Sequence, residues 1–304
     1  MIDTLKTLAQ SHGDKLAMVS MDSTRTLQAD LAKFRSDRDM QLSDYQKWIF
    51  DEIHRFDSPA HMRSVIIVAV SRPFYARVTW HVGNKQYQAF SGVAADTDKA
   101  SDYITTDVQA AGYKINKETR LPLKSLAVQS GLAQYGRNNI AYVDGMGSAA
   151  ALLAFSTDIP WDDATWHEPV FSPTCDGCDI CLSLCPTNAI VADNPLIDSH
   201  NCLTRLNQLD DDFPDWVSPT AHHSTYYCLL CQARCPMNKG QEVIDISFDQ
   251  AETARILAGR PYDDVSDELA SKIALLTGLG KLDTVPRNLR VLFDAMDKGH
   301  VPKL

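Results

Sequence analysis

Hydrophobic positions along the first 160 residues switch between strand and helix spacing. Residues 64–71 (SVIIVAVS) form a β-branched run bounded by polar residues, which predicts a buried strand. Residues 42–56 carry apolar and aromatic side chains at helical intervals, residues 91–111 predict another helix, and residues 151–160 predict a strand that ends at a proline. Helices that alternate with strands in this way predict an α/β domain.

The next part of the pattern contains a glycine-bounded turn. Residues 123–143 predict a helix that ends near Gly131, then the turn, then a strand over 140–143, and Gly145 and Gly147 mark a further turn. The pattern is helical again over 241–304, with breaks at 260–261 and 278–280. We therefore expect an α/β domain over 1–168, a cysteine module over 169–242 and a helical C-terminal segment over 243–304.

Composition and charge narrow the class of protein. The chain has 304 residues, a net charge of −10 and no apolar stretch long enough to cross a membrane. Its first residues, MIDTLKTLAQSHGDK, lack the apolar segment of a signal peptide, so we expect a cytoplasmic protein without a membrane partner. A net acidic chain disfavours nucleic-acid binding, because phosphate contacts need clustered Lys and Arg.

The eight cysteines all lie between Cys175 and Cys235. A disulfide scaffold would spread its cysteines over the fold and needs an oxidising compartment, so clustered thiols in a cytoplasmic chain favour ligands. The run from Cys175 to Cys185 has the spacing C-x2-C-x2-C-x3-C-P, which is typical of a bacterial ferredoxin and its 4Fe–4S clusters. Structural zinc has no use for this spacing, and His222 and His223 are interpreted as surface polar residues.

A second cysteine block, C-x2-C-x3-C-P over 228–236, has one thiol fewer, and the isolated Cys202 completes the count. In such runs the cysteine before the proline ligates the other cluster. We therefore predict two sets of four metal-ligating thiols: Cys175, Cys178, Cys181 and Cys235 for the first 4Fe–4S cluster, and Cys185, Cys202, Cys228 and Cys231 for the second.

Further motifs carry a resemblance to a known family. The chain has GLAQYGRNN over 131–139, Gly147-Ser148, STDIP over 156–160 and then the cysteine module. This order resembles the epoxyqueuosine reductases and the related corrinoid reductive dehalogenases, over roughly residues 60–240. Arg63-Ser64-Val65-Ile66 and the segment PRNL over 286–289 are also similar to that family.

The resemblance implies a nitroreductase-like N-terminal domain that holds base-off cobalamin. The nearer cluster would then reduce the cobalt to a nucleophilic Co(I) state that attacks the substrate. The motif positions imply these cofactor-binding residues: Gly131, Gly136, Arg137, Asn138, Ser148, Thr157 and Asp158. The alternative for the turn is a helix C-cap at Gly136 followed by a surface arginine.

A reductive site also needs a proton donor, because the clusters deliver electrons without protons. The family's donor is an Asp in a V-D-S-x-P-like stretch, and here Thr119 occupies that position with Glu118 next to it. Glu118 and Tyr87 are therefore the candidate catalytic residues. The alternatives are a solvated loop carboxylate for Glu118 and a boundary tyrosine with a packing role for Tyr87.

Together these features predict an oxidoreductase: a cobalamin-dependent iron–sulfur reductase that acts on a small molecule or a modified nucleoside. An external electron donor such as ferredoxin or flavodoxin is implied. A tRNA partner is not expected, because the segment from Asp245 onward has 8 basic and 10 acidic residues. The alternative is an iron–sulfur electron-transfer protein with a non-catalytic or flavin-binding N-terminal domain.

Overall fold

The computed structural model describes the chain except residues 41, 55, 58, 163–165, 193–195, 261 and 277–283. It divides into two compact units, each made of two chain segments. Unit 1 comprises Met1–Ser71 and Ala95–Gly177, and unit 2 comprises Arg72–Ala94 and Cys178–Leu304.

Unit 1 is built around a four-stranded sheet in the order β1-β2-β8-β5, with antiparallel pairing throughout. The strands are β1 (Lys15–Ser20), β2 (Ser64–Ser71), β8 (Ala150–Thr157) and β5 (Ile115–Glu118). Alternate residues of β2 face two different hydrophobic clusters: Ile66 and Val68 belong to one, Val65 and Ile67 to the other. Both faces of the sheet are therefore buried, which is why the run 64–71 is hydrophobic without interruption.

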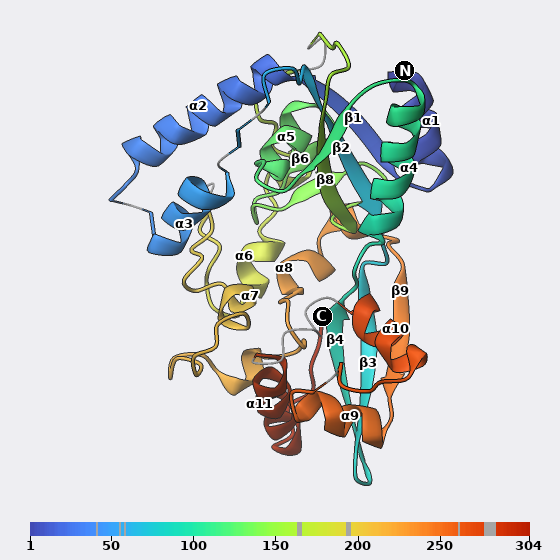
Figure 1. Cartoon of the computed structure of the whole chain (residues 1–304). Helices are drawn as coiled ribbons and strands as arrows, with labels where there is room; N and C mark the ends of the chain where they lie inside the picture. Colours follow the sequence, from blue (N-terminus) through green and yellow to red (C-terminus); the bar gives the residue numbers. More distant parts are fainter. Residues whose placement is uncertain are drawn as a thin grey trace. The chain divides into compact units, whose positions relative to one another are not determined.

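Helices cover both faces of this sheet (Figure 1). One cluster combines the sheet with α1 (Ile2–Ser11) and α4 (Thr97–Ala110), and the other with α2 (Met21–Asp37) and α5 (Leu123–Gln129). Ser20 ends β1 and caps α2, because its hydroxyl accepts a hydrogen bond from the Ser23 amide at 3.0 Å. The remaining elements of unit 1 are α3 (Asp44–Trp48), the π-helical turn η1 (Ile49–Ile53), the hairpin β6 (Ala133–Tyr135) and β7 (Ala141–Val143), and the 3-10 turn η2 (Pro173–Cys175).

Unit 2 contains a three-stranded sheet in the order β4-β3-β9 (Figure 1). The hairpin β3 (Tyr75–Val82) and β4 (Lys85–Gly92) is antiparallel, and β9 (Val243–Phe248) pairs with β3 in parallel. One face packs on α9 (Gln250–Leu257), α10 (Asp267–Leu275) and α11 (Val285–Asp297), with Trp80 stacked on Phe248 at 4.5 Å between ring centroids. In β3, buried residues alternate with more exposed ones, so this sheet has one covered face.

The cysteine module of unit 2 consists of short turns and loops. Its elements are α6 (Ile180–Leu184), α7 (Leu203–Leu206), η3 (Pro219–Ala221), α8 (Leu230–Ala233) and η4 (Pro236–Asn238). The two helices that carry cysteines, α6 and α8, contact each other. Leu203, Leu206, Val217 and Ala221 form a small hydrophobic cluster that Cys228 packs against.

The mixed α/β fold is confirmed, and several predicted elements match closely. The strand expected over 64–71 is β2, the turn marked by Gly145 and Gly147 has positive φ angles of 73° and 58°, and α5 is followed by Gly131 with φ of 78°. The helix expected over 42–56 is α3 with η1, and that over 91–111 is α4. The nitroreductase-like topology stays a prediction.

Two features differ from the sequence-based expectation. The segment 243–304 is not helical throughout, because β9 occupies its start, where β3 supplies hydrogen bonds along a parallel register. The hairpin β3-β4 consequently belongs with the C-terminal part of the chain rather than with residues 1–168. Pro261 and the glycines of the break at 278–280 lie outside the described residues. No helix within the described ranges is long and apolar enough to cross a membrane.

Candidate functional site

The thiols predicted to hold the second cluster are neighbours in unit 2. Burial raises the pKa of Cys228 well above its usual value, and the nearby thiols of Cys231, Cys202 and Cys185 raise it further. Burial likewise raises the pKa of Cys202, to which Cys185 also contributes. Four thiols from three separate chain segments therefore gather at one place. They are free cysteines, each half-buried, and so they suit a cluster held by four thiolates.

Hydrogen bonds to sulfur and to the ligand backbone hold these cysteines in place. The Ala189 amide donates to Cys185 Sγ at 3.2 Å, and the Cys228 amide donates to Thr204 Oγ1 at 2.9 Å. Among the described residues, no three His, Cys, Asp or Glu side chains converge closely enough for a single metal ion. The thiols of a cubane bind different iron atoms and stand further apart than the ligands of one ion, so this spacing is compatible with a cluster.

Arg137 contacts the first cysteine of the run within unit 1. Its backbone amide donates to Cys175 Sγ at 3.4 Å, and its guanidinium donates to the Cys175 carbonyl at 2.9 Å. Amide hydrogen bonds to a ligating sulfur are one of the ways in which proteins set cluster potentials. Arg137 was predicted to bind the corrinoid, but these contacts direct it toward a cysteine that was predicted to ligate iron.

The other residues of the same turn have packing contacts. Asn138 is 4% exposed and donates through Nδ2 to the Tyr142 hydroxyl at 2.9 Å. A Cβ atom added at Gly136 would lie 2.5 Å from Cε2 of Tyr142, so only glycine fits there. Gly131 takes a left-handed conformation with φ of 78° at the end of α5.

The remaining residues predicted to bind the corrinoid are also engaged within unit 1. Ser148 and Thr157 are 6% and 0% exposed, and Thr157 Oγ1 accepts from the Ile159 amide at 3.4 Å. Asp158 accepts a hydrogen bond from the Lys114 amide at 2.8 Å. As a set, these side chains stabilise turns and a strand end and do not line a described cavity. Their role as corrinoid ligands stays an untested prediction.

The two candidate proton donors lie in different units. Tyr87 in unit 2 is 6% exposed, donates to Asp297 Oδ1 at 3.0 Å and stacks on Phe293 with ring centroids 4.3 Å apart. Burial and the Asp297 carboxylate raise the pKa of Tyr87, which makes it a weaker acid. These contacts agree with the packing alternative. The catalytic role of Tyr87 stays an untested prediction.

Glu118 ends β5 in unit 1 and accepts a hydrogen bond from the hydroxyl of Ser156, which is fully buried. It is therefore a partly buried, oriented carboxylate rather than a freely solvated one. Ser156 is a partner that sequence reasoning did not assign, although it opens the STDIP motif. The antiparallel register that sets Asn116 opposite Ser156 is the long-range information that the motif alone lacks.

The expectation that His222 and His223 are surface residues is wrong. They are 1% and 2% exposed, and burial lowers the pKa of each to about 4. His223 accepts from the Leu229 amide at Nε2 (3.4 Å) and donates from Nδ1 to the Ala221 carbonyl (2.9 Å). A neutral imidazole thereby joins the loop before Cys228 to the start of α8, a role that local polarity does not reveal.

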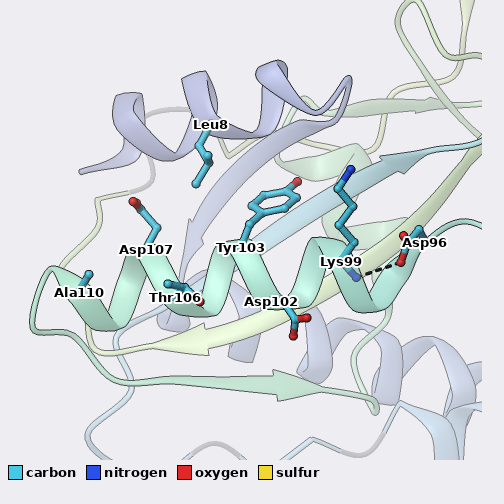
Figure 2. Close-up of a pocket in the computed structure, with 8 residues that line it drawn as sticks. All are labelled: Leu8, Asp96, Lys99, Asp102, Tyr103, Thr106, Asp107 and Ala110. Carbon is cyan, nitrogen blue, oxygen red and sulfur yellow. Dashed lines mark hydrogen bonds between the residues drawn. The ribbon is translucent and has the colours of Figure 1, made fainter.

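A hollow of about 750 Å³ lies in unit 1 between α1 and α4. Figure 2 shows the residues that line it, with Leu8 of α1 facing Tyr103 and Asp107 of α4. The Asp96 side chain at its end caps α4 by accepting from the Lys99 amide at 3.0 Å. Tyr103 donates to the buried Asp14 carboxylate at 2.6 Å. None of the residues predicted for catalysis or cofactor binding lines this hollow.

Comparisons with known proteins agree with the resemblance. Residues 174–238 match the family model described as a 4Fe-4S double cluster binding domain. Epoxyqueuosine reductase from Staphylococcus aureus is 26% identical over 195 residues, which cover 59% of this chain and 49% of that relative. A crystal structure of epoxyqueuosine reductase with an epoxyqueuosine-modified tRNA-Tyr stem loop aligns with a TM-score of 0.66 at 18% identity, over 98% of this chain and 82% of that one. A catabolic reductive dehalogenase aligns with a TM-score of only 0.42, over 82% of this chain and 32% of the other, which is too low to support an argument.

The tRNA-bound structure corrects the expected partner. The sequence favoured a small-molecule substrate and gave no reason to expect tRNA, yet a protein of the same fold was solved with a modified tRNA stem loop. The net charge of −10 is a sum over the whole chain, whereas RNA contact needs only a local group of cations. The matched relative bears the name of a reductase, in agreement with the predicted oxidoreductase class, and the matched segment spans about half of its length. The chain resembles epoxyqueuosine reductases in sequence, carries a double-cluster domain and shares their fold.

Proposed function

We propose that this chain is an iron–sulfur reductase that reduces a modified nucleoside carried by tRNA. The grouping of Cys185, Cys202, Cys228 and Cys231 in unit 2 carries the proposal, because four convergent thiols suit a cluster that transfers single electrons. The modified-nucleoside substrate follows from the relatives' name and from the tRNA-bound structure of the same fold. Reduction of the epoxide breaks both of its C–O bonds, forms a C=C bond and releases the oxygen as water, which takes two electrons and two protons. The two clusters supply one electron each.

In this proposal the first cluster is held by Cys175, Cys178, Cys181 and Cys235, and Arg137 sets its potential. The Arg137 amide points at Cys175 Sγ, so it stabilises the extra negative charge of the reduced cluster. The Ala189 amide has the same relation to Cys185 in the second set. Glu118, oriented by Ser156, is the proposed proton donor.

The resemblance also implies a bound corrinoid, which is a more specific proposal than the iron–sulfur clusters. Arg137, Asn138, Thr157 and Asp158 each have a hydrogen-bond partner inside unit 1, and their contact with a corrinoid stays a prediction. We therefore assign no proton or electron step to cobalamin here. The double-cluster domain supports the iron part of the cofactor prediction, and cobalt content is the measurement that decides the corrinoid. The cytoplasmic location likewise stays a prediction.

The test is cofactor content together with turnover. The full chain is purified without oxygen after growth with hydroxocobalamin, and iron, cobalt and flavin are measured. A reduced sample is then incubated with an epoxyqueuosine-containing tRNA stem loop, and the nucleosides are separated by mass spectrometry. About eight iron per chain and loss of the epoxide are expected.

A Cys228→Ser variant tests the site itself. Cys228→Ser is expected to lose about half of the iron and all turnover, because one cluster loses a ligand. Ser183→Ala changes an exposed residue between Cys181 and Cys185. It is the matched control and should keep both the iron content and the turnover. Full iron content without any turnover on the stem loop would contradict the reductase and favour the electron-transfer alternative.

A further inference from the structure

The sheet of unit 2 has a second face that α9, α10 and α11 do not cover. Val78, Trp80 and Ala89 point to the helices, so the intervening residues of β3 and β4 point the other way. In the register of the hairpin, Thr79 lies opposite Gln88 and Arg77 lies opposite Phe90. Side chains on neighbouring strands of this face are therefore close enough to act on one ligand.

A hollow of about 620 Å³ lies along this face. It is lined by residues of β3 and β4, by Asp245 of β9, by Met296 near the end of α11, and by residues 300–302, which follow that helix. This volume lies within the usual range for small-molecule sites and is large enough for one nucleoside. None of the residues predicted for catalysis or cofactor binding lines it.

The polar groups in the hollow are available for a ligand. Gln86 and Gln88 are exposed side chains two residues apart on β4, and Thr79 adds a hydroxyl from β3. No hydrogen bond joins these three side chains to any other residue that the structure describes. A carboxamide offers a donor and an acceptor side by side, which complements the edge of a nucleobase.

Apolar side chains supply the other contacts that a base requires. Phe90 is half-buried in the wall of the hollow, and Val301 is 64% exposed at its rim. A base that stacks on an exposed aromatic or aliphatic surface gains binding energy without charge.

The hollow and its margin differ in charge. Arg77 binds Asp245 with two hydrogen bonds of 2.7 and 2.8 Å, and Lys85 binds Asp297 at 2.8 Å, so these pairs are neutral. Lys298 and Lys303, which flank the lining segment 300–302, have no ion-pair partner among the described residues. The hollow therefore favours an uncharged group, and its margin favours phosphate.

We propose that this hollow binds one unpaired base of the RNA substrate, with the adjoining phosphates on Lys298 and Lys303. The inference rests on the proposed function, since it gives the RNA a second point of attachment. It assigns base contacts to Gln86, Gln88 and Phe90 and backbone contacts to the two lysines. Base contacts confer specificity and phosphate contacts confer salt dependence.

The experiment measures binding of a fluorescein-labelled tRNA anticodon stem loop to the cluster-loaded full chain. The double variant Gln86→Ala/Gln88→Ala is expected to bind about tenfold more weakly, with unchanged iron content. Gln10→Ala/Gln109→Ala, which removes two exposed amides from helices of unit 1, is the matched control and binds like the original protein. Lys298→Gln/Lys303→Gln is expected to reduce the slope of log K against log salt by about one to two.

A 4-thiouridine crosslink locates the RNA directly, and we expect it in peptides that cover 75–92 or 296–304. Equal binding by the Gln86→Ala/Gln88→Ala variant, with crosslinks elsewhere, would overturn this inference and leave the reductase proposal intact. Absence of any RNA binding by the unmodified protein would overturn both. Self-association that the same variant abolishes would assign the face to a second copy of the chain and overturn the RNA site.

Discussion

The sheet of unit 1 and the cysteine module of unit 2 are stabilised in different ways. The sheet has hydrophobic clusters on both faces, and β2 contributes to each of them. The module over 178–240 has one small hydrophobic cluster of its own, adds Tyr226 to the large cluster of unit 2, and buries polar side chains such as Asn207, His222 and His223. The sheet can therefore fold through burial of apolar surface alone, whereas we expect the module to depend on hydrogen bonds and on iron bound by its cysteines.

The largest effect is expected from removal of the clusters. Without iron, amide protection over 178–240 should fall by about ten-thousandfold or more, which corresponds to about 5.5 kcal/mol of local opening free energy. The physical reason is that the module buries few apolar residues, four of them in its own cluster, and these are too few to hold its loops without bound metal. Hydrogen exchange of the loaded and the iron-free chain measures this change.

The same experiment contains its own control. Strands β2 and β8 and the helices α9 and α11 have large hydrophobic clusters and should keep their protection in the iron-free chain. If β2 and β8 lose protection as much as 178–240 do, the distinction between the two regions does not hold.

A substitution in the sheet of unit 1 should have the next largest effect. Phe155 in β8 is fully buried in the cluster that the sheet forms with α1 and α4, so Phe155→Ala should cost about 3–5 kcal/mol. Phe171→Ala removes the same side chain from a site that is 50% exposed and should cost less than about 1 kcal/mol. Urea unfolding of the two variants measures the difference, and equal losses would contradict a hydrophobic core on the face of the sheet that α1 and α4 cover.

The sequence predicted elements with a continuous or regular local pattern, and it missed features that depend on distant segments. The run 64–71 predicted β2 because an uninterrupted series of hydrophobic residues is typical of a strand with both faces buried. The strand β9 was missed because it is an edge strand with only Phe248 buried, and its partner β3 lies far away in the sequence. Spacing alone also grouped Cys185, Cys202, Cys228 and Cys231, whereas the contacts of Arg137 and Tyr87 depend on distant segments that no local pattern contains.

A buried amide offers a smaller test of the polar network in unit 2. Asn288 in α11 is fully buried and donates through Nδ2 to the carbonyls of Asn207 and Thr225, each at 3.0 Å. Asn288→Ala leaves both carbonyls without that donor and should lower the free energy of unfolding by about 2–3 kcal/mol. Asn116→Ala, on the exposed side of β5, is the control and should change it by less than about 0.5 kcal/mol. The urea unfolding midpoints of the two variants measure this change. A small loss of unfolding free energy in Asn288→Ala would argue against a structural polar network.

The smallest expected effect is a dependence of stability on pH through His222 and His223. Burial lowers the pKa of His223 to about 4, below the value of about 6.5 for an unfolded histidine. The unfolded chain therefore takes up the proton first, so this contribution to stability is complete above pH 6.5 and decreases as the pH falls toward 4. The expected slope is on the order of 1 kcal/mol per pH unit for each such histidine.

The variant His223→Gln separates this contribution from other acid effects. A glutamine carboxamide can still accept from the Leu229 amide but takes up no proton, so the slope between pH 6.5 and 5.5 should fall by roughly half while His222 continues to titrate. His61→Gln, at an exposed position, should leave the slope unchanged. Urea unfolding of the cluster-loaded protein at pH 6.5 and at pH 5.5 measures the slope. An unchanged slope in His223→Gln would mean that the acid sensitivity of the module lies in its thiol ligands and not in its buried imidazoles.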